Sequence, residues 1–263
     1  KNAILINTLP SSNVGTISAF SGSGKMYNFQ LSDLEYDKDY SLYALTSLAA
    51  EEKIIMLIDS TEINLYKYLI TVSRNGYIKK SFTSYYNVRA KRGTPSAKLN
   101  DDDELIAVFL SNDNDDKVFI VNENGNYNYY PISEVGVTAR TTKGVKAIKL
   151  DNKEHVKTAT IIKNNIKYTG LLSISSDGYG KITSLDQYNI TSRAVKGIKV
   201  MSLNENKIVS IYAVPESQEK IFIFSPKTAV CVETKDISLQ NRATSGSKLI
   251  NINDTNIMIM WGI

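Results

Sequence analysis

Apolar and polar positions along the chain form short strand-like runs joined by turn signals. The runs are rich in β-branched and aromatic residues, and the clearest are residues 68–72, 118–121, 171–174 and 221–224. Each is followed by a turn and a second strand-like run, with Asn75-Gly76, Asn124-Gly125 and Asp177-Gly178 supplying the positive φ of tight hairpins. The pattern therefore predicts β-hairpins, and only the stretch from Tyr43 to Glu52 predicts a turn or two of helix.

The hairpins repeat at a period near fifty residues. The turn glycines Gly24, Gly76, Gly125 and Gly178 are spaced by 52, 49 and 53 residues, and Pro226-Lys227-Thr228 forms a degenerate fifth turn. A second marker, Arg-x-x-x-Gly, follows the last four turns at 89–93, 140–144, 193–197 and 242–246, spaced by 51, 53 and 49 residues. Two independent markers in one register indicate a structural repeat.

Each repeat contains about four strand-like runs, because another run follows each Arg-x-x-x-Gly marker and one more comes after it. One four-stranded sheet cannot bury both of its faces alone, so five stacked repeats predict an all-β, propeller-like ring. The predicted repeats are 14–63, 64–113, 114–166, 167–216 and 217–263, in a single domain. Residues 1–13 fit the last strand of a preceding repeat, and the first repeat has an acidic segment, 35–39, where its marker should lie.

Composition excludes several classes of function. A single cysteine, Cys231, rules out a disulfide framework, and with the single histidine, His155, it leaves neither a multi-cysteine zinc site nor a His-rich metal site. We therefore expect no metal and no catalytic residue. We also expect no membrane span, since no apolar run approaches the roughly 20 residues that one requires. The low cysteine content is typical of a reducing, cytoplasmic compartment.

The net charge of 31 − 27 = +4 conceals an uneven distribution. Residues 1–66 carry 4 basic and 8 acidic side chains, whereas residues 67–263 carry 27 basic and 19 acidic ones, and the stretch from Lys67 to Lys98 has eight basic residues and no acidic one. Basic residues at equivalent positions of successive repeats would line one rim of a ring and could follow a phosphate backbone. The predicted track is Lys79, Lys80, Arg89, Lys91, Arg92, Arg140, Lys143, Lys146, Lys181, Arg193, Lys196 and Lys199.

Each of these features also has a purely structural interpretation. Lys79-Lys80 could be a solvated strand edge, and the marker could be a turn glycine with an arginine that ties down a loop. The tyrosines, such as Tyr127, Tyr129 and Tyr130 in strand-like alternation, favour core packing over base stacking.

Segments 68–80, 103–108 and 138–150 closely resemble the C-terminal domain of the A subunit of bacterial type IIA DNA topoisomerases, namely gyrase A and its topoisomerase IV counterpart. The resemblance implies a β-pinwheel of about fifty-residue, four-stranded blades, here five full repeats plus a strand of a sixth, whose basic outer rim binds duplex DNA and bends or wraps it. The Gln-Arg-Arg-Gly-Gly-Lys-Gly box of gyrase A domains is absent. It either lies upstream of Lys1 or is degenerate, as in topoisomerase IV subunits.

The resemblance further implies a non-catalytic accessory domain, since in the family the catalytic tyrosine lies in an N-terminal breakage-reunion domain. The implied partners are that domain and the topoisomerase B subunit. ATP and Mg are used by other domains of the parent enzyme, with no cofactor expected here. The alternative from another class is a propeller that serves as a protein-interaction platform within the parent subunit. The sequence does not decide whether the parent is a gyrase or a topoisomerase IV, or whether the blades form a closed ring or an open spiral. It also leaves the angle and the chirality of DNA bending undecided.

Overall fold

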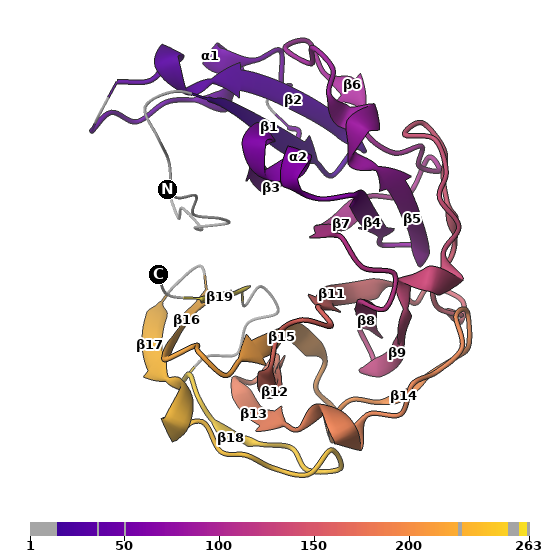
Figure 1. Ribbon diagram of the computed structural model, residues 1–263. Helices are drawn as coiled ribbons and strands as arrows, with labels where there is room; N and C mark the ends of the chain where they lie inside the picture. The colour runs from indigo at the N-terminus through magenta and orange to yellow at the C-terminus, as the bar shows by residue number, and fades with distance from the viewer. Residues whose placement is uncertain (1–14, 36, 50, 226–227, 252–257, 262–263) are drawn as a thin grey trace. The chain divides into compact units, whose positions relative to one another are not determined.

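The polypeptide folds into a succession of antiparallel β-hairpins, seen in a computed structural model that describes residues 15–35, 37–49, 51–225, 228–251 and 258–261 (Figure 1). The strand predicted at 1–13 and residues 226–227 of the predicted fifth turn lie outside the described residues. Within these ranges the chain forms an N-terminal unit, residues 15–113 and 135–145, and a C-terminal unit, residues 114–134 and 146–261. The all-β prediction is confirmed, and the prediction of a single domain stays a prediction.

The N-terminal unit contains two four-stranded sheets. The first has the order β3-β1-β2-β6, with β1 (Thr16–Ser21), β2 (Lys25–Gln30), β3 (Ile54–Asp59) and β6 (Thr94–Pro95). The second has the order β10-β5-β4-β7, with β4 (Tyr68–Ser73), β5 (Tyr77–Phe82), β7 (Leu105–Ser111) and β10 (Val145–Lys146), the last lying at the division between the units. The short helices are η1 (Leu31–Asp33), α1 (Leu42–Leu45), α2 (Ser60–Leu65) and η2 (Thr83–Tyr86).

The C-terminal unit continues the same plan. Its sheets have the orders β11-β8-β9-β14, β15-β12-β13-β18 and β17-β16-β19. The strands are β8 (Lys117–Asn122), β9 (Asn126–Pro131), β11 (Val156–Ile162), β12 (Tyr168–Ser175), β13 (Tyr179–Thr183), β14 (Ile198–Lys199), β15 (Ile208–Pro215), β16 (Lys220–Phe224), β17 (Ala229–Glu233), β18 (Ser247–Lys248) and β19 (Met258–Trp261). One 3-10 turn follows each hairpin: η3 (Ile132–Glu134), η4 (Leu185–Gln187) and η5 (Thr234–Asp236).

The fourth strand of each four-stranded sheet comes from the following sequence repeat. Strand β6, which follows the marker of the second repeat, pairs with β2 of the first, so that Lys25 lies opposite Pro95. The same exchange places β14 against β9 and β18 against β13 (Figure 1). Each of these sheets therefore contains four strands, as predicted, and the following repeat supplies the fourth.

The hairpin turns depend on glycine and on an acid from the loop that leads into β3, β7 or β11. Gly178 has φ +82°, and a Cβ added there would lie 2.1 Å from the Ile250 carbonyl oxygen, so both backbone conformation and space require glycine. In the second repeat the Asp103 carboxylate accepts from Ser73 Oγ at 2.7 Å and from the backbone N–H of Asn75 at 2.8 Å. Glu52 and Glu154 act on their own turns in the same way.

Tightly packed aromatic residues form the core beside the β8–β9 hairpin, as predicted for the tyrosines. Tyr127 and Tyr130 are fully buried and Tyr129 is nearly so. Phe119 stacks on Tyr127 with ring centroids 4.7 Å apart, and Tyr188 meets the Tyr127 ring edge-on at 5.3 Å. Such pairs each add about 0.5–1.5 kcal/mol beyond their buried area.

Helices are few and short. The helix predicted between Tyr43 and Glu52 is reduced to α1, and α2, which the sequence did not predict, begins at a cap in which the Asp59 carboxylate accepts from the Thr61 N–H at 2.7 Å. Among the described residues, no helix is long and apolar enough to cross a membrane.

Candidate nucleic-acid interface

The four marker loops, residues 89–93, 140–144, 193–197 and 242–246, are fixed by glycine packed against the preceding sheet. Their last residues have φ between +80° and +90°. A Cβ added at Gly144 would lie 2.2 Å from the Ile78 carbonyl oxygen, and one at Gly197 would lie 2.2 Å from that of Tyr127. The marker glycine is therefore what allows each loop to approach the second strand of the preceding hairpin.

The marker arginines bind the backbone of the preceding marker's edge strand. Arg193 donates from Nη1 to the Lys146 carbonyl at 2.5 Å, and Arg242 donates to the Lys199 carbonyl at 2.6 Å. Arg140 donates to the Pro95 carbonyl and, at 3.2 Å, to Thr94 Oγ1. In all three cases the acceptor carbonyl belongs to the residue six positions after the preceding marker's arginine. The structural interpretation of these arginines is thus correct, and the guanidinium keeps further donors beyond this contact.

Two lysines predicted for the track are buried instead. Lys79 is 1% exposed and donates from Nζ to Tyr86 Oη at 3.0 Å and to the carbonyls of Ser96 and Arg140 at 2.5 Å each. Burial, assisted by the nearby Arg140 charge, lowers the pKa of Lys79 to about 7.

Lys181 lies three residues after its turn glycine, as Lys79 does, and is fully buried. It donates to the carbonyls of Asn241 and Arg242, the latter at 2.8 Å, and to Thr244 Oγ1 at 3.1 Å. Burial, with the Arg242 charge, lowers the pKa of Lys181 to about 8. Both ammonium groups hold the next marker loop in place, so neither is available to a DNA phosphate, and we withdraw both residues from the predicted track.

Lys80 is withdrawn for a similar reason. It is 3% exposed, with its Nζ lying over the Tyr68 ring 4.9 Å from the centroid, and burial lowers its pKa. The solvated strand edge proposed for Lys79-Lys80 is wrong as well, because β5 is covered on both faces.

The other nine predicted residues are at least partly accessible. Arg140, Lys143 and Arg193 are half-buried, and Lys143 Nζ lies 3.9 Å from the centroid of the Tyr77 ring. The exposed ones are Arg89, Lys91, Arg92, Lys146, Lys196 and Lys199. Marker loops of the N-terminal unit carry Arg89, Lys91, Arg92, Arg140 and Lys143, whereas a marker loop of the C-terminal unit carries Arg193 and Lys196. Lys146 and Lys199 lie in the edge strands β10 and β14 that follow two of these loops.

Two exposed cations already have partners within the protein. Lys196 Nζ lies 2.5 Å from the Asp151 carboxylate, whose hydrogen bond and charge raise the pKa of that lysine. Lys199 Nζ donates to the Asn124 carbonyl at 2.5 Å. Ion pairs and hydrogen bonds this exposed contribute little to stability, so a phosphate can compete for these groups.

Four further cations share these positions and were missed. Lys98 and Lys149 are exposed nine residues after their marker arginines, Arg242 begins the last marker, and Lys248 corresponds in register to Lys199. Lys248 Nζ donates to the Asp177 carbonyl at 2.7 Å, as Lys199 does to Asn124. Alignment of the four markers would have found all of them.

Comparison with known proteins gives the same family as the sequence. The family described as DNA gyrase C-terminal domain, beta-propeller, matches residues 67–112, 116–163, 171–215 and 232–255, which is more than half of the chain. The DNA gyrase A subunit of Metamycoplasma arthritidis is 30% identical over 209 residues, covering 78% of this chain and 23% of its own length. That of Mycoplasma genitalium is 28% identical over 244 residues, covering 89% of this chain and 28% of its own length.

The fold is shared with a solved structure as well. The crystal structure of the C-terminal domain of DNA topoisomerase IV has a TM-score of 0.83 at 19% identity, covering 94% of this chain and 79% of that one. This chain spans about a quarter of the length of the curated relatives it matches. On the family match and the repeated marker loops together, the chain belongs to the DNA gyrase C-terminal domain family.

Proposed function

We propose that the chain binds duplex DNA along the exposed basic residues of its marker loops and bends or wraps it as the accessory domain of a gyrase A-like subunit. The supporting observation is that cations recur at fixed positions in loops that are held rigidly against successive sheets. Lys79 and Lys181 contribute indirectly, by holding the loops that carry the accessible groups.

Such an interface would recognise phosphates rather than bases. Lysine and arginine contacts to the backbone release counterions and carry no sequence information, so affinity should fall steeply with salt and vary little with sequence. Bending a site of 20–30 base pairs by 40–90° costs on the order of 1–6 kcal/mol, which several contacts acting together must supply.

The rest of the proposal follows family membership. The domain would be non-catalytic and need no cofactor of its own. It would work in the bacterial cytoplasm with the breakage-reunion domain of its own polypeptide and, through the parent enzyme, with the topoisomerase B subunit.

The test compares two fourfold charge reversals of equal size. The track variant replaces Lys91, Arg92, Lys196 and Lys199 by glutamate, and the control variant replaces Lys38, Lys153, Lys220 and Lys235, which are exposed outside the marker loops. Binding to duplexes of about 40 base pairs is measured across a salt series. If all four track residues contact phosphates, that variant should bind all sequences more weakly, and the slope of log K against log salt should fall by about 3.6.

Equal effects of the two variants would reduce the result to overall charge and contradict a defined track. Unchanged DNA affinity in both, with retention of a protein partner, would favour the interaction platform. Ligation of nicked circles in the presence of the chain then separates two modes: a positive linking-number change indicates gyrase-like wrapping, and no change indicates topoisomerase IV-like binding.

A further inference from the structure

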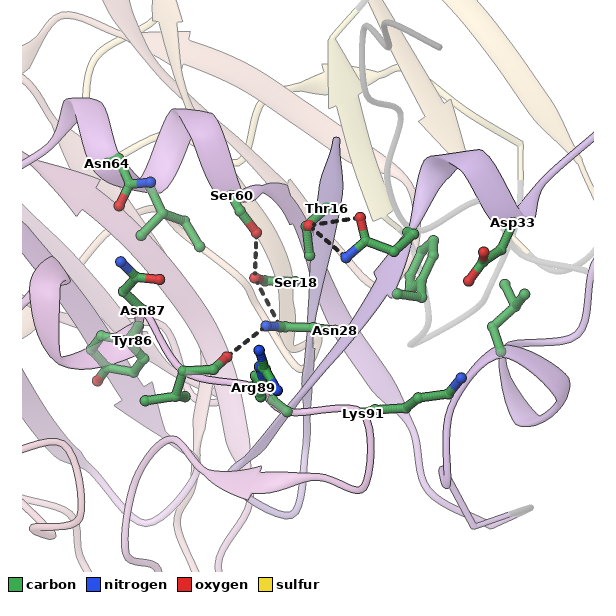
Figure 2. A pocket seen from close by; sticks show the side chains of 16 residues that line it. Thr16, Ser18, Asn28, Asp33, Ser60, Asn64, Tyr86, Asn87, Arg89 and Lys91 are labelled. Atoms are coloured by element: carbon green, nitrogen blue, oxygen red, sulfur yellow. Dashed lines mark hydrogen bonds between the residues drawn. The ribbon is translucent and has the colours of Figure 1, made fainter. Parts of the chain in front are cut away.

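A pocket of about 580 Å³, lined by many polar residues, lies within the N-terminal unit. Of the track residues, Arg89 and Lys91 line it and the others do not. Its floor is formed by β1 and β2, and its walls by α2 and the loop that leads into the first marker (Figure 2). The volume is within the range of about 300–1,000 Å³ that is usual for small-molecule sites.

The floor is more polar than the same positions of the next hairpin. Thr16, Ser18, Asn28 and Gln30 occupy it, with Thr16 opposite Gln30 and Ser18 opposite Asn28 across the β1–β2 hairpin. In the next hairpin the corresponding residues are Tyr68, Phe82, Ile70 and Lys80. There the Tyr68 and Phe82 rings stack 5.8 Å apart, so aromatic side chains occupy the place that the first repeat lines with hydroxyl and amide groups.

Hydrogen bonds organise this floor in advance. Ser60 Oγ on α2 lies 3.2 Å from Ser18 Oγ, which donates to Asn28 Oδ1 at 3.1 Å, and Asn28 Nδ2 donates to the Val88 carbonyl at 2.9 Å (Figure 2). The helix that supplies Ser60 has no counterpart in the next two repeats, where a short turn at 112–116 and another at 163–167 take its place. In the first repeat, α2 therefore forms one wall of the pocket, and polar side chains form its floor where the next hairpin has Tyr68 and Phe82.

Arg89 is the marker arginine that faces this pocket, and it lacks the contact made by the other three. Arg140 donates to the carbonyl of Pro95, which lies in β6 shortly before Lys98. The residue equivalent to Lys98 in the first repeat is Ser47, because the backbone N–H of each donates at 3.1 Å to the carbonyl of the third residue of the following marker. Just before Ser47 stands α1 instead of an edge strand. Arg89 makes no hydrogen bond to any other residue that the structure describes, and its guanidinium is left for another acceptor.

The charges around the pocket define its ligand. Arg89, Lys91, Asn28 and Asp33 all line the pocket, and Figure 2 shows Arg89 and Lys91 on the same loop. A guanidinium and an ammonium on one wall match a phosphate, while a single carboxylate and several hydroxyl and amide groups match the hydroxyls of a sugar. We propose that this pocket binds a sugar phosphate, with the phosphate at Arg89 and Lys91 and the sugar on the polar floor.

The probe is ribose 5-phosphate, titrated into the 263-residue chain with calorimetric detection, beside ribose and inorganic phosphate. Ribose 5-phosphate should bind at least about tenfold more tightly than either half alone, because both parts of the pocket contribute. Arg89→Gln should weaken it by about tenfold or more. Arg92→Gln, a change of the same charge in the same loop but outside the pocket lining, should leave it unchanged.

Asn64→Leu, on the exposed face of α2 that lines the pocket, gives a second variant far from the marker loop and should also weaken binding. Failure of ribose 5-phosphate to bind at about 10 mM, or equal affinities of the Arg89→Gln and Arg92→Gln variants, would overturn the proposal. Competition with a 40-base-pair duplex identifies the source of the ligand: displacement indicates the sugar-phosphate backbone of DNA, and simultaneous binding indicates a free sugar phosphate. The inference does not depend on the proposed function, since the titration is performed without DNA.

Discussion

Replacing the marker glycine Gly144 by alanine should detach β10 from the sheet that it completes. Gly144 has φ +88°, in the left-handed region that costs an L-residue about 1–2 kcal/mol. The new Cβ would lie 2.2 Å from the Ile78 carbonyl oxygen and 2.9 Å from Lys79 Cβ, so the loop must retreat by about 1 Å. Overpacking of this kind costs about 1–3 kcal/mol, which brings the total to about 2–5 kcal/mol.

The measurement is urea unfolding followed by circular dichroism, together with hydrogen exchange of the β5 amides. With a denaturant slope of about 1–3 kcal/mol per M, the midpoint should fall by about 1–2 M or more. The matched control is Gly136→Ala, a few residues earlier in the same connection, where the added Cβ meets nothing within 4 Å and φ is not left-handed. If Gly144→Ala is as stable as Gly136→Ala and β5 keeps its protection, the marker glycine does not secure the exchanged strand.

Two further predictions concern the cations. The pKa of Lys79 is about 7 in the folded chain and about 10.5 in the unfolded chain, so between these pH values the unfolded state binds the extra proton. Stability should therefore rise from pH 7 toward pH 10. Lys79→Met should flatten that part of a profile of melting temperature against pH. Arg193→Ala should destabilise the chain by about 0.5–1.5 kcal/mol in thermal unfolding, since its hydrogen bond to the Lys146 carbonyl is lost, whereas Lys196→Ala should leave the stability nearly unchanged because the pair with Asp151 is exposed.

Local signals in the sequence were enough to predict the hairpins, their turns and the period. They could not predict which neighbour an edge strand joins, because Thr94–Pro95 is only two residues long and its pairing with β2 depends on how Gly93 packs against Tyr27.

The site was predicted less well for a different reason. A lysine in sequence indicates exposure to solvent, yet Lys79 and Lys181 lie in buried strands whose free edge is covered by the next marker loop. Only the tertiary arrangement of three carbonyl or hydroxyl oxygens around each ammonium makes that burial tolerable. The pocket above β1 and β2 was equally hidden, since it depends on comparing the same sheet positions between repeats and on the unpredicted helix α2.

Strand exchange also sets a timetable for the nascent chain. Lys25 must wait for Pro95, Asn126 for Lys199 and Tyr179 for Lys248, delays of about 70 residues in each case. At a synthesis rate of roughly 5–20 residues per second, the second strand of each of these hairpins spends roughly 4–14 s on the ribosome with one open edge. An open edge can pair with the edge of another chain, such as one on a neighbouring ribosome of the same message. This architecture is therefore most prone to misassembly during synthesis, whatever the stability of the finished protein.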